Sequence, residues 1–219
     1  MTSTGAAPKA GPHRKLGVLG NALDRRFSRL QQEYLREESA AKADLARLRR
    51  GLGKPAGSVP EIWELTIGSV PDSLSWDRDE PSRAEQASHA AFTLFALHQQ
   101  SLNVAVHEPG TSFGHAVGKL RSKSTRSPEA VTNRFMAVST AESVDEALVH
   151  MRGLITQLRS EHEGFDYARL ADDLTGLLTP ARAARVRLAW GRDFYRTSAD
   201  TAESGDSGEN DSTDENTEE

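Results

Sequence analysis

Three histidines and one glutamate in one segment are the residues whose types could form a metal site or a catalytic base. They are His98, His107, His115 and Glu108. Pro109-Gly110 interrupts the segment, and no two of the histidines have the i, i+4 spacing that places two ligands on one helix face. We therefore expect no metal site, with His98 a hydrogen-bonded helix residue and the other two histidines at the surface. A helical hydrolase that uses His98 or His107 with Glu108 is the alternative.

The other patterns that could support catalysis are incomplete. Asp172-Asp173 are adjacent and Glu161 and Glu163 are two residues apart, and neither spacing places two carboxylates on the same helix face. Gly17-x-x-Gly20 lacks the Lys and Ser/Thr of a phosphate-binding loop. The chain has no Cys, which excludes a thiolate nucleophile, a Cys-ligated metal and a disulfide. The sequence therefore indicates a protein that is not an enzyme and needs no cofactor.

Positive charge is arranged more informatively, in three clusters that few acidic residues interrupt. The clusters are Arg47, Arg49, Arg50 and Lys54; Lys119, Arg121, Lys123 and Arg126, close to Arg134; and Arg182, Arg185, Arg192 and Arg196. The last four lie within an arc of roughly 80° on a predicted helix. Clusters of this kind can follow a phosphate backbone by charge, without contacts to bases.

Each basic cluster also has a simpler interpretation as a solvated helix face. The first cluster lies at a predicted helix C-terminus, where cations also stabilise the helix dipole. Few aromatic residues interleave with the basic ones, so the sequence does not indicate stacking on unpaired bases.

The formal net charge of −5 hides an uneven distribution along the 219 residues. Residues 197–219 hold four Asp and five Glu with no Lys or Arg, which leaves 23 acidic against 27 basic residues in the rest and a net charge there of +4. The acidic segment has few apolar residues, none larger than Ala, so we expect a disordered tail over 197–219. Residues 1–13, rich in Pro, Gly, Ala, Ser and Thr, are expected to be disordered too. The folded domain is then residues 14–196.

Hydrophobic spacing across that domain predicts helices and no strands. Apolar residues recur at helical spacing over 16–34, 41–52, 60–65, 83–105, 112–120, 128–138, 144–164, 166–178 and 180–196. We therefore predict an all-α bundle of about eight or nine helices, with residues 109–111 as a candidate boundary between two sub-bundles. The helix from residue 83 is apolar nearly all round, which indicates the central buried helix. No apolar run approaches the length of a membrane span, and we expect no membrane partner.

Helix starts are marked by capping residues. Ser82-Arg83-Ala84-Glu85 and Ser143-Val144-Asp145-Glu146 are capping boxes. Gly17 and Gly20 disfavour the first turns of the first helix, so Asn21 is the expected N-cap there.

Several short segments occur in an order that resembles a known family. They are Ala46-Arg47-Leu48-Arg49-Arg50-Gly51 followed by Pro60-Glu61-Ile62-Trp63; Leu94-Phe95-Ala96-Leu97-His98-Gln99; Gly110-Thr111-Ser112-Phe113-Gly114-His115-Ala116; Arg134-Phe135; Phe165-Asp166-Tyr167-Ala168-Arg169-Leu170-Ala171-Asp172-Asp173-Leu174; and Trp190-Gly191-Arg192-Asp193-Phe194-Tyr195. Over residues 40–196 the chain resembles the CasB family, the small subunit of the type I-E CRISPR Cascade surveillance complex.

That resemblance implies a non-enzymatic, cytoplasmic protein that forms a head-to-tail pair with a second copy of itself. Its other partners would be the backbone and large subunits of Cascade, the guide RNA, and the target and non-target DNA strands. It would stabilise the assembly and the R-loop through backbone contacts, while guide pairing reads the sequence. A helical protein-interaction adaptor without nucleic-acid binding is the alternative from another functional class.

The candidate nucleic-acid-binding residues follow from the motif match and from charge. Arg49 and Arg50 come first because they lie within a matching motif. The further candidates, which depend more on charge and expected helical exposure, are Arg47, Lys119, Arg121, Lys123, Arg126, Arg134, Arg152 and Arg192.

Overall fold

Residues 14–76, 78–123 and 127–205 are described by the computed structural model, with side chains described as far as Thr197. The helices are α1 (Val18–Leu35), α2 (Ser39–Gly51), η1 (Pro60–Ile62), η2 (Ile67–Ser69), η3 (Asp72–Leu74), α3 (Arg83–His98), α4 (Phe113–Lys123), α5 (Pro128–Thr140), α6 (Val144–Ser160), α7 (Tyr167–Leu177) and α8 (Pro180–Gly205). The elements named η are short 3₁₀ helices. The described residues contain no strand, only a single bridge between His107 and Phe165. The prediction of an all-α bundle is confirmed.

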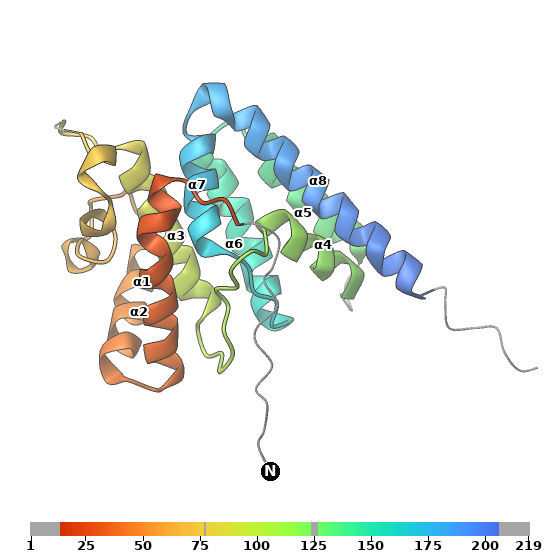
Figure 1. The fold of residues 1–219 in the computed structure, drawn as a ribbon, viewed down its shortest axis with the longest axis horizontal. Coiled ribbons are helices and arrows are strands. Elements are labelled where there is room, and N and C mark those ends of the chain that lie inside the picture. The colour runs from red at the N-terminus through yellow and green to blue at the C-terminus, as the bar shows by residue number, and fades with distance from the viewer. Residues whose placement is uncertain (1–13, 77, 124–126, 206–219) are drawn as a thin grey trace, which may run out of the picture.

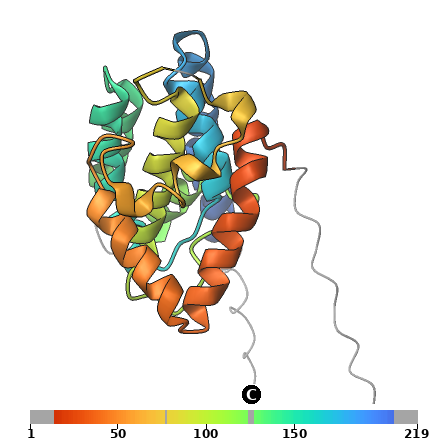
Figure 2. The same cartoon turned by 90° about the vertical axis from the view of Figure 1, so that its left-hand side faces the viewer.

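Two groups of helices share one core. The helices α1 and α2 form an antiparallel hairpin, and α3 and α7 pack beside it (Figures 1 and 2). In the second group, α8 lies along α4, while α5 packs on α6 (Figure 1). The groups are joined because α7 also contacts α8 and α3 also contacts α6. Residues 109–111 connect α3 to α4, but α7 comes from the second half of the chain and completes the first group.

Aromatic side chains fill the core of both groups. Phe27 of α1 stacks on Phe92 of α3, with 4.3 Å between ring centroids, and Tyr167 of α7 lies 5.7 Å from Phe27. In the second group Phe135 stacks on Phe194 at 4.3 Å. All five rings are almost fully buried, so each supplies a large hydrophobic contribution to folding. The expected burial of α3 on nearly all sides is confirmed.

Three helix starts show how far capping could be predicted. The box at Ser82 is complete, since Ser82 Oγ accepts from the Glu85 N–H and the Glu85 carboxylate accepts from the Ser82 N–H. At α6, Ser143 Oγ accepts from the Glu146 N–H at 3.1 Å, but the Glu146 carboxylate accepts from the Glu142 N–H instead. The prediction that Asn21 caps the first helix is wrong.

The N-cap of α1 is Gly17, and an acid on another helix satisfies the first turn. Asp172 of α7 accepts from the backbone N–H groups of Gly17, at 2.6 Å, and Gly20, at 2.9 Å. A Cβ atom on Gly20 would lie 2.2 Å from the Asp172 carboxylate, so glycine permits this close approach. The Ala168 carbonyl oxygen of α7 would also lie 2.8 Å from that added atom, so Gly20, which disfavours the helix locally, is required by its packing on α7.

The ends of α3 and α8 also differ from the sequence interpretation. We expected the helix from residue 83 to reach about Ala105, but α3 ends at His98. The chain then turns through Ser101, whose φ is +61°, and Gln99 Nε2 donates to the carbonyls of Leu102 and Val104. At the other end α8 runs to Gly205, so residues 197–205 belong to this helix rather than only to a tail. The expected disordered segments over 1–13 and 206–219 lie outside the described residues.

Candidate nucleic-acid interface

The last turn of α2 carries the two arginines that the motif match favours. Arg50 is exposed and Arg49 is half-buried, and neither forms an ion pair with a described acidic side chain. Arg47 differs, because its guanidinium lies 3.0 Å from the carboxylate of Asp44. The structure therefore separates the three arginines into one that is paired within the protein and two that have no ion-pair partner among the described residues.

Arg152 of α6 joins this end of α2, although it is far away in the sequence. Gly53 follows α2 with a φ of +79°, and a Cβ atom there would lie 2.4 Å from Arg152 Nη2. The guanidinium thus rests against the backbone of the turn, which only glycine permits. Lys54 is exposed beside it. We call Arg49, Arg50, Lys54 and Arg152 the α2–α6 basic cluster.

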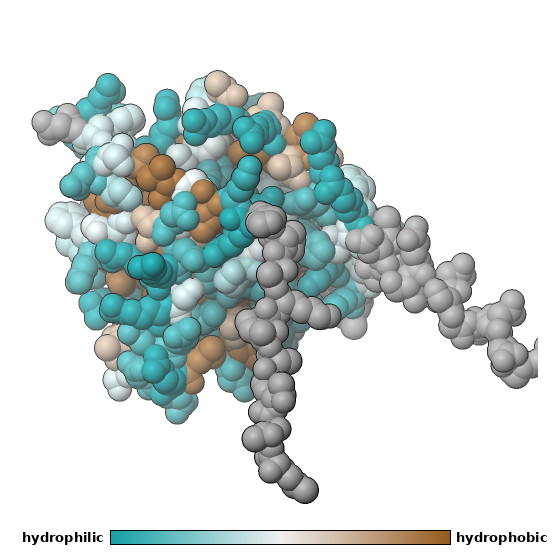
Figure 3. Space-filling view, in the orientation of Figure 1, coloured by the Kyte–Doolittle hydropathy of each residue, from teal (hydrophilic) through white to brown (hydrophobic). Residues whose placement is uncertain are grey.

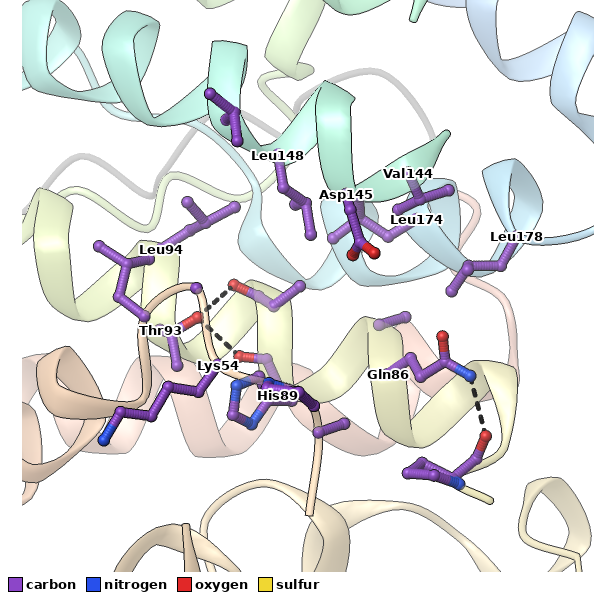
Figure 4. Close-up of a pocket in the computed structure, with 18 of the residues that line it drawn as sticks. Lys54, Gln86, His89, Thr93, Leu94, Val144, Asp145, Leu148, Leu174 and Leu178 are labelled. Carbon is purple, nitrogen blue, oxygen red and sulfur yellow. Dashed lines mark hydrogen bonds between the residues drawn. The ribbon is translucent and has the colours of Figure 1, made fainter. Parts of the chain in front are cut away.

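A cavity of about 590 Å³ adjoins this cluster. In Figure 4, Val144, Asp145 and Leu148 of α6 face Gln86, His89 and Thr93 of α3 across it. Burial lowers the pKa of His89, whose Nε2 lies 3.1 Å from the Gly51 carbonyl oxygen. The Thr93 hydroxyl donates to carbonyls within its own helix. His89 and Thr93 therefore both bind backbone carbonyls rather than forming a side-chain hydrogen bond with each other.

The lysines of α4 are partly neutralised. Glu163, which is buried, forms ion pairs with Lys123 and, at 3.7 Å, with Lys119. The hydrogen bond to Glu163 raises the pKa of Lys123. Two cations against one anion leave a smaller positive potential here than the sequence cluster alone indicates.

Two other candidates of the second cluster, Arg121 and Arg134, contact neighbouring helices. Arg134 of α5 is exposed and packs along α6, where a Cβ atom on Gly153 would lie 3.1 Å from Arg134 Cδ. Arg121 lies over the ring of Phe194, 5.1 Å from its centroid. Arg126 lies outside the described residues.

The outer face of α8 carries the third cluster. Trp190 and Phe194 point into the core, which turns the opposite side of the helix to solvent. Arg182, Arg185, Arg192 and Arg196 are all exposed there. Asp193 of the same helix pairs with Arg169 at 3.1 Å and only marginally with Arg196 at 4.0 Å. On the molecular face in Figure 3, hydrophilic residues cover most of the described surface and hydrophobic ones form small separate patches.

The histidines that could have formed a catalytic set are structural. His107 is buried, so its expected surface position is wrong; its Nδ1 accepts from the Tyr167 N–H at 3.1 Å and its Nε2 donates to Asp24 at 3.2 Å. His98 Nδ1 lies 3.0 Å from the Tyr167 hydroxyl, and burial lowers the pKa of His98 to about 3. His115 Nδ1 lies 2.7 Å from the Thr197 hydroxyl. The described residues contain no group of three side chains suited to a metal ion.

A partly buried ionic network, which the sequence did not indicate, joins the start of the described chain to α1 and to the N-terminus of α7. Arg14 Nη2 donates to Asp24 at 2.7 Å and to Asp166 at 2.6 Å. Asp166 also accepts from the N–H groups of Gly110 and Arg169, and so caps α7. Burial opposes its charged form, but the hydrogen bonds from Arg14 and the backbone hold the pKa of Asp166 below its usual value. This network stabilises the fold rather than forming a reaction site.

The fold and these surfaces define an all-α protein that carries clusters of exposed positive charge. The family model for CRISPR-associated protein Cse2 matches residues 44–195, so the chain belongs to the Cse2 family, also called CasB, the small subunits of Cascade complexes. The Cse2 protein of Thermus thermophilus is 25% identical over 169 residues, which cover 77% of this chain and 88% of that protein.

Solved structures agree with this assignment. The crystal structure of CasB from Thermobifida fusca is 34% identical with a TM-score of 0.68, over 83% of this chain and 99% of that one. A chain of a CRISPR RNA-guided surveillance complex, 18% identical, shares the fold with a TM-score of 0.68 over 86% of this chain and 99% of its own length. None of the helices described here is long and apolar enough to cross a membrane.

Proposed function

We propose that this chain is a non-catalytic subunit of a type I-E RNA-guided DNA surveillance complex and that it stabilises the R-loop. It contacts the backbones of the target and displaced strands by charge, while the guide RNA reads the sequence. It works in the cytoplasm beside a second copy of itself and the backbone and large subunits. Membership of the Cse2 family and the likeness to a surveillance-complex chain support this role.

The observation that carries the proposal is the unpaired charge of Arg49 and Arg50. Both project from the last turn of α2 and meet no described carboxylate within ion-pair distance. A guanidinium that keeps its charge can bind a phosphate and release condensed counterions, which favours association. Arg47 is paired with Asp44, so it contributes less.

Small contributions of this kind can decide whether an R-loop persists. The guide–target heteroduplex is about as stable as the DNA duplex that it replaces, so protein–backbone contacts tip the balance. Each phosphate contact makes the fall of log K with log salt concentration steeper by about 0.7 to 0.9. Loss of two contacts should therefore make the slope shallower by roughly 1.4 to 1.8, about equally for every target sequence.

The test is the double variant Arg49→Ala/Arg50→Ala in the reconstituted surveillance complex, with R-loop stability measured over a salt series. The matched control is Arg29→Ala/Arg36→Ala, in α1 and directly after it, which removes the same charge from arginines that are paired with Glu33 and Glu38. We expect a shallower slope and a less stable R-loop for the first variant only.

The adaptor alternative predicts a different result. If the complex with Arg49→Ala/Arg50→Ala binds its target as wild type does from low to high salt, these residues do not contact the backbone. Equal losses in both double variants would show an effect of net charge alone, and the site would be rejected.

A further inference from the structure

Tyr195 is an exposed aromatic residue among the arginines of α8. It keeps 54% of its surface in contact with solvent, although large aromatic rings usually lie in a core or an interface. The sequence did not indicate base stacking, because few aromatic residues interleave with the basic ones. The structure changes that interpretation by placing one ring directly on the basic face.

The ring is held in place from the protein side. Phe194 meets it edge-on, with 5.0 Å between centroids and 84° between ring planes. The guanidinium of Arg121 from α4 lies over the same ring, 5.8 Å from its centroid. A ring that is already ordered loses little conformational freedom when a flat group stacks on its open side.

The surroundings of Tyr195 favour a polyanion. Arg192 lies one helical turn before it and Arg196 follows it directly, and both are exposed. Asp193 pairs mainly with Arg169, so it does not cancel the charge beside the ring. Tyrosine and arginine are also common at protein–protein interfaces, but several exposed arginines on one helix face favour a partner rich in negative charge, and cations beside an aromatic platform are typical of single-strand binding.

We propose that Tyr195 stacks on an unpaired base of a single-stranded nucleic acid whose flanking phosphates meet Arg192 and Arg121. This inference rests on the proposed function and names the form of nucleic acid that the α8 face receives. The contact is tolerant of sequence, because every base has a π-face. Stacking on Tyr195 does not depend on salt concentration, and it adds to the phosphate contacts of the arginines, which do.

The experiment uses the full chain and a single-stranded DNA oligonucleotide that carries 2-aminopurine, whose fluorescence falls on stacking. Affinity is measured over a salt series for wild type, Tyr195→Ala, Tyr195→Phe, Leu188→Ala and Arg192→Ala. Leu188→Ala is the matched control, since Leu188 lies two turns away on the same face and is also 54% exposed but has no π-face. Circular dichroism confirms the helical fold of each variant.

Loss of stacking and loss of charge give different signatures. Tyr195→Ala should weaken single-strand binding about 5- to 100-fold with the salt slope unchanged and the quenching lost. Tyr195→Phe and Leu188→Ala should bind within about twofold of wild type, while Arg192→Ala should reduce the slope by about one.

Three outcomes would overturn the proposal. If Tyr195→Ala binds and quenches as wild type does, while the salt slope of Arg192→Ala is still shallower, stacking is rejected and the proposed function is unaffected. If Tyr195→Phe binds the oligonucleotide as weakly as Tyr195→Ala does, the contact belongs to the hydroxyl group, and stacking is again rejected. A full chain that binds no oligonucleotide even at the lowest salt contradicts both the stacking contact and charge-based binding.

Discussion

The same substitution, glycine to alanine, should have opposite effects at two helical positions. Gly114 of α4 faces α8 so closely that an added Cβ atom would lie 2.3 Å from the backbone oxygen of Trp190. Gly118, one turn later, has the Phe194 oxygen at 2.7 Å from the same added atom. Gly191 of α8 has nothing within 4 Å of an added Cβ atom. The contact between α4 and α8 is therefore a close backbone approach that requires glycine on one side only.

The magnitudes follow from these distances. Ordinary contact begins at 3.4 Å, so Gly114→Ala must move α8 by about 1 Å, against backbone atoms that cannot rotate away. Overpacking of this kind costs about 1–3 kcal/mol or more. Gly191→Ala meets no clash and gains helix propensity, which stabilises by about 0.5–1 kcal/mol.

Urea unfolding followed by circular dichroism measures both changes in the free energy of unfolding. We expect a lower midpoint for Gly114→Ala and a higher midpoint for Gly191→Ala. The close packing of α4 on α8 would be refuted if both variants changed the free energy of unfolding in the same direction. It would also be refuted if the free energy of unfolding of Gly114→Ala were within about 0.5 kcal/mol of wild type.

Two further predictions concern buried acids. Burial raises the pKa of Asp173 to about 6, so the folded state holds this proton more tightly than the unfolded state, and its contribution to stability is lost as pH rises. Between about pH 4 and 6 the free energy of unfolding of wild type should therefore fall relative to that of Asp173→Asn, by up to about 1.4 kcal/mol per pH unit. Urea unfolding measures both, and parallel pH profiles of the two proteins would contradict the prediction. Glu163→Gln should release Lys119 and Lys123 and steepen the salt dependence of DNA binding by up to about one per released contact, whereas an unchanged slope would show that these lysines do not reach the backbone.

The helical architecture could be predicted because it depends on local patterns. The apolar stripe of α6, with Leu158 and Met151 buried, and the Ser82 capping box are both present as predicted. Such features depend on side chains within one or two turns of each other, so a single sequence contains the information. The end of α3 was predicted too late, because Gln99 closes the following turn with its side chain.

The surface could be predicted only in part, because the charge that remains depends on pairing between distant segments. The sequence placed Lys119 and Lys123 in a basic cluster, but it could not show that Glu163 folds back onto them. Nor could it bring Arg152 to the turn at Gly53, since that contact joins two segments separated by several helices. Composition identified where cations are concentrated, and packing determines which of them are available.

The most direct test of the account is a structure of the assembled complex bound to its target DNA. We predict that the guanidinium groups of Arg49, Arg50 and Arg192 lie within hydrogen-bonding distance of phosphate oxygens and that none of them contacts a base edge. If these groups instead face solvent or the carboxylates of neighbouring subunits, the idea that this protein holds DNA by its exposed charge is wrong.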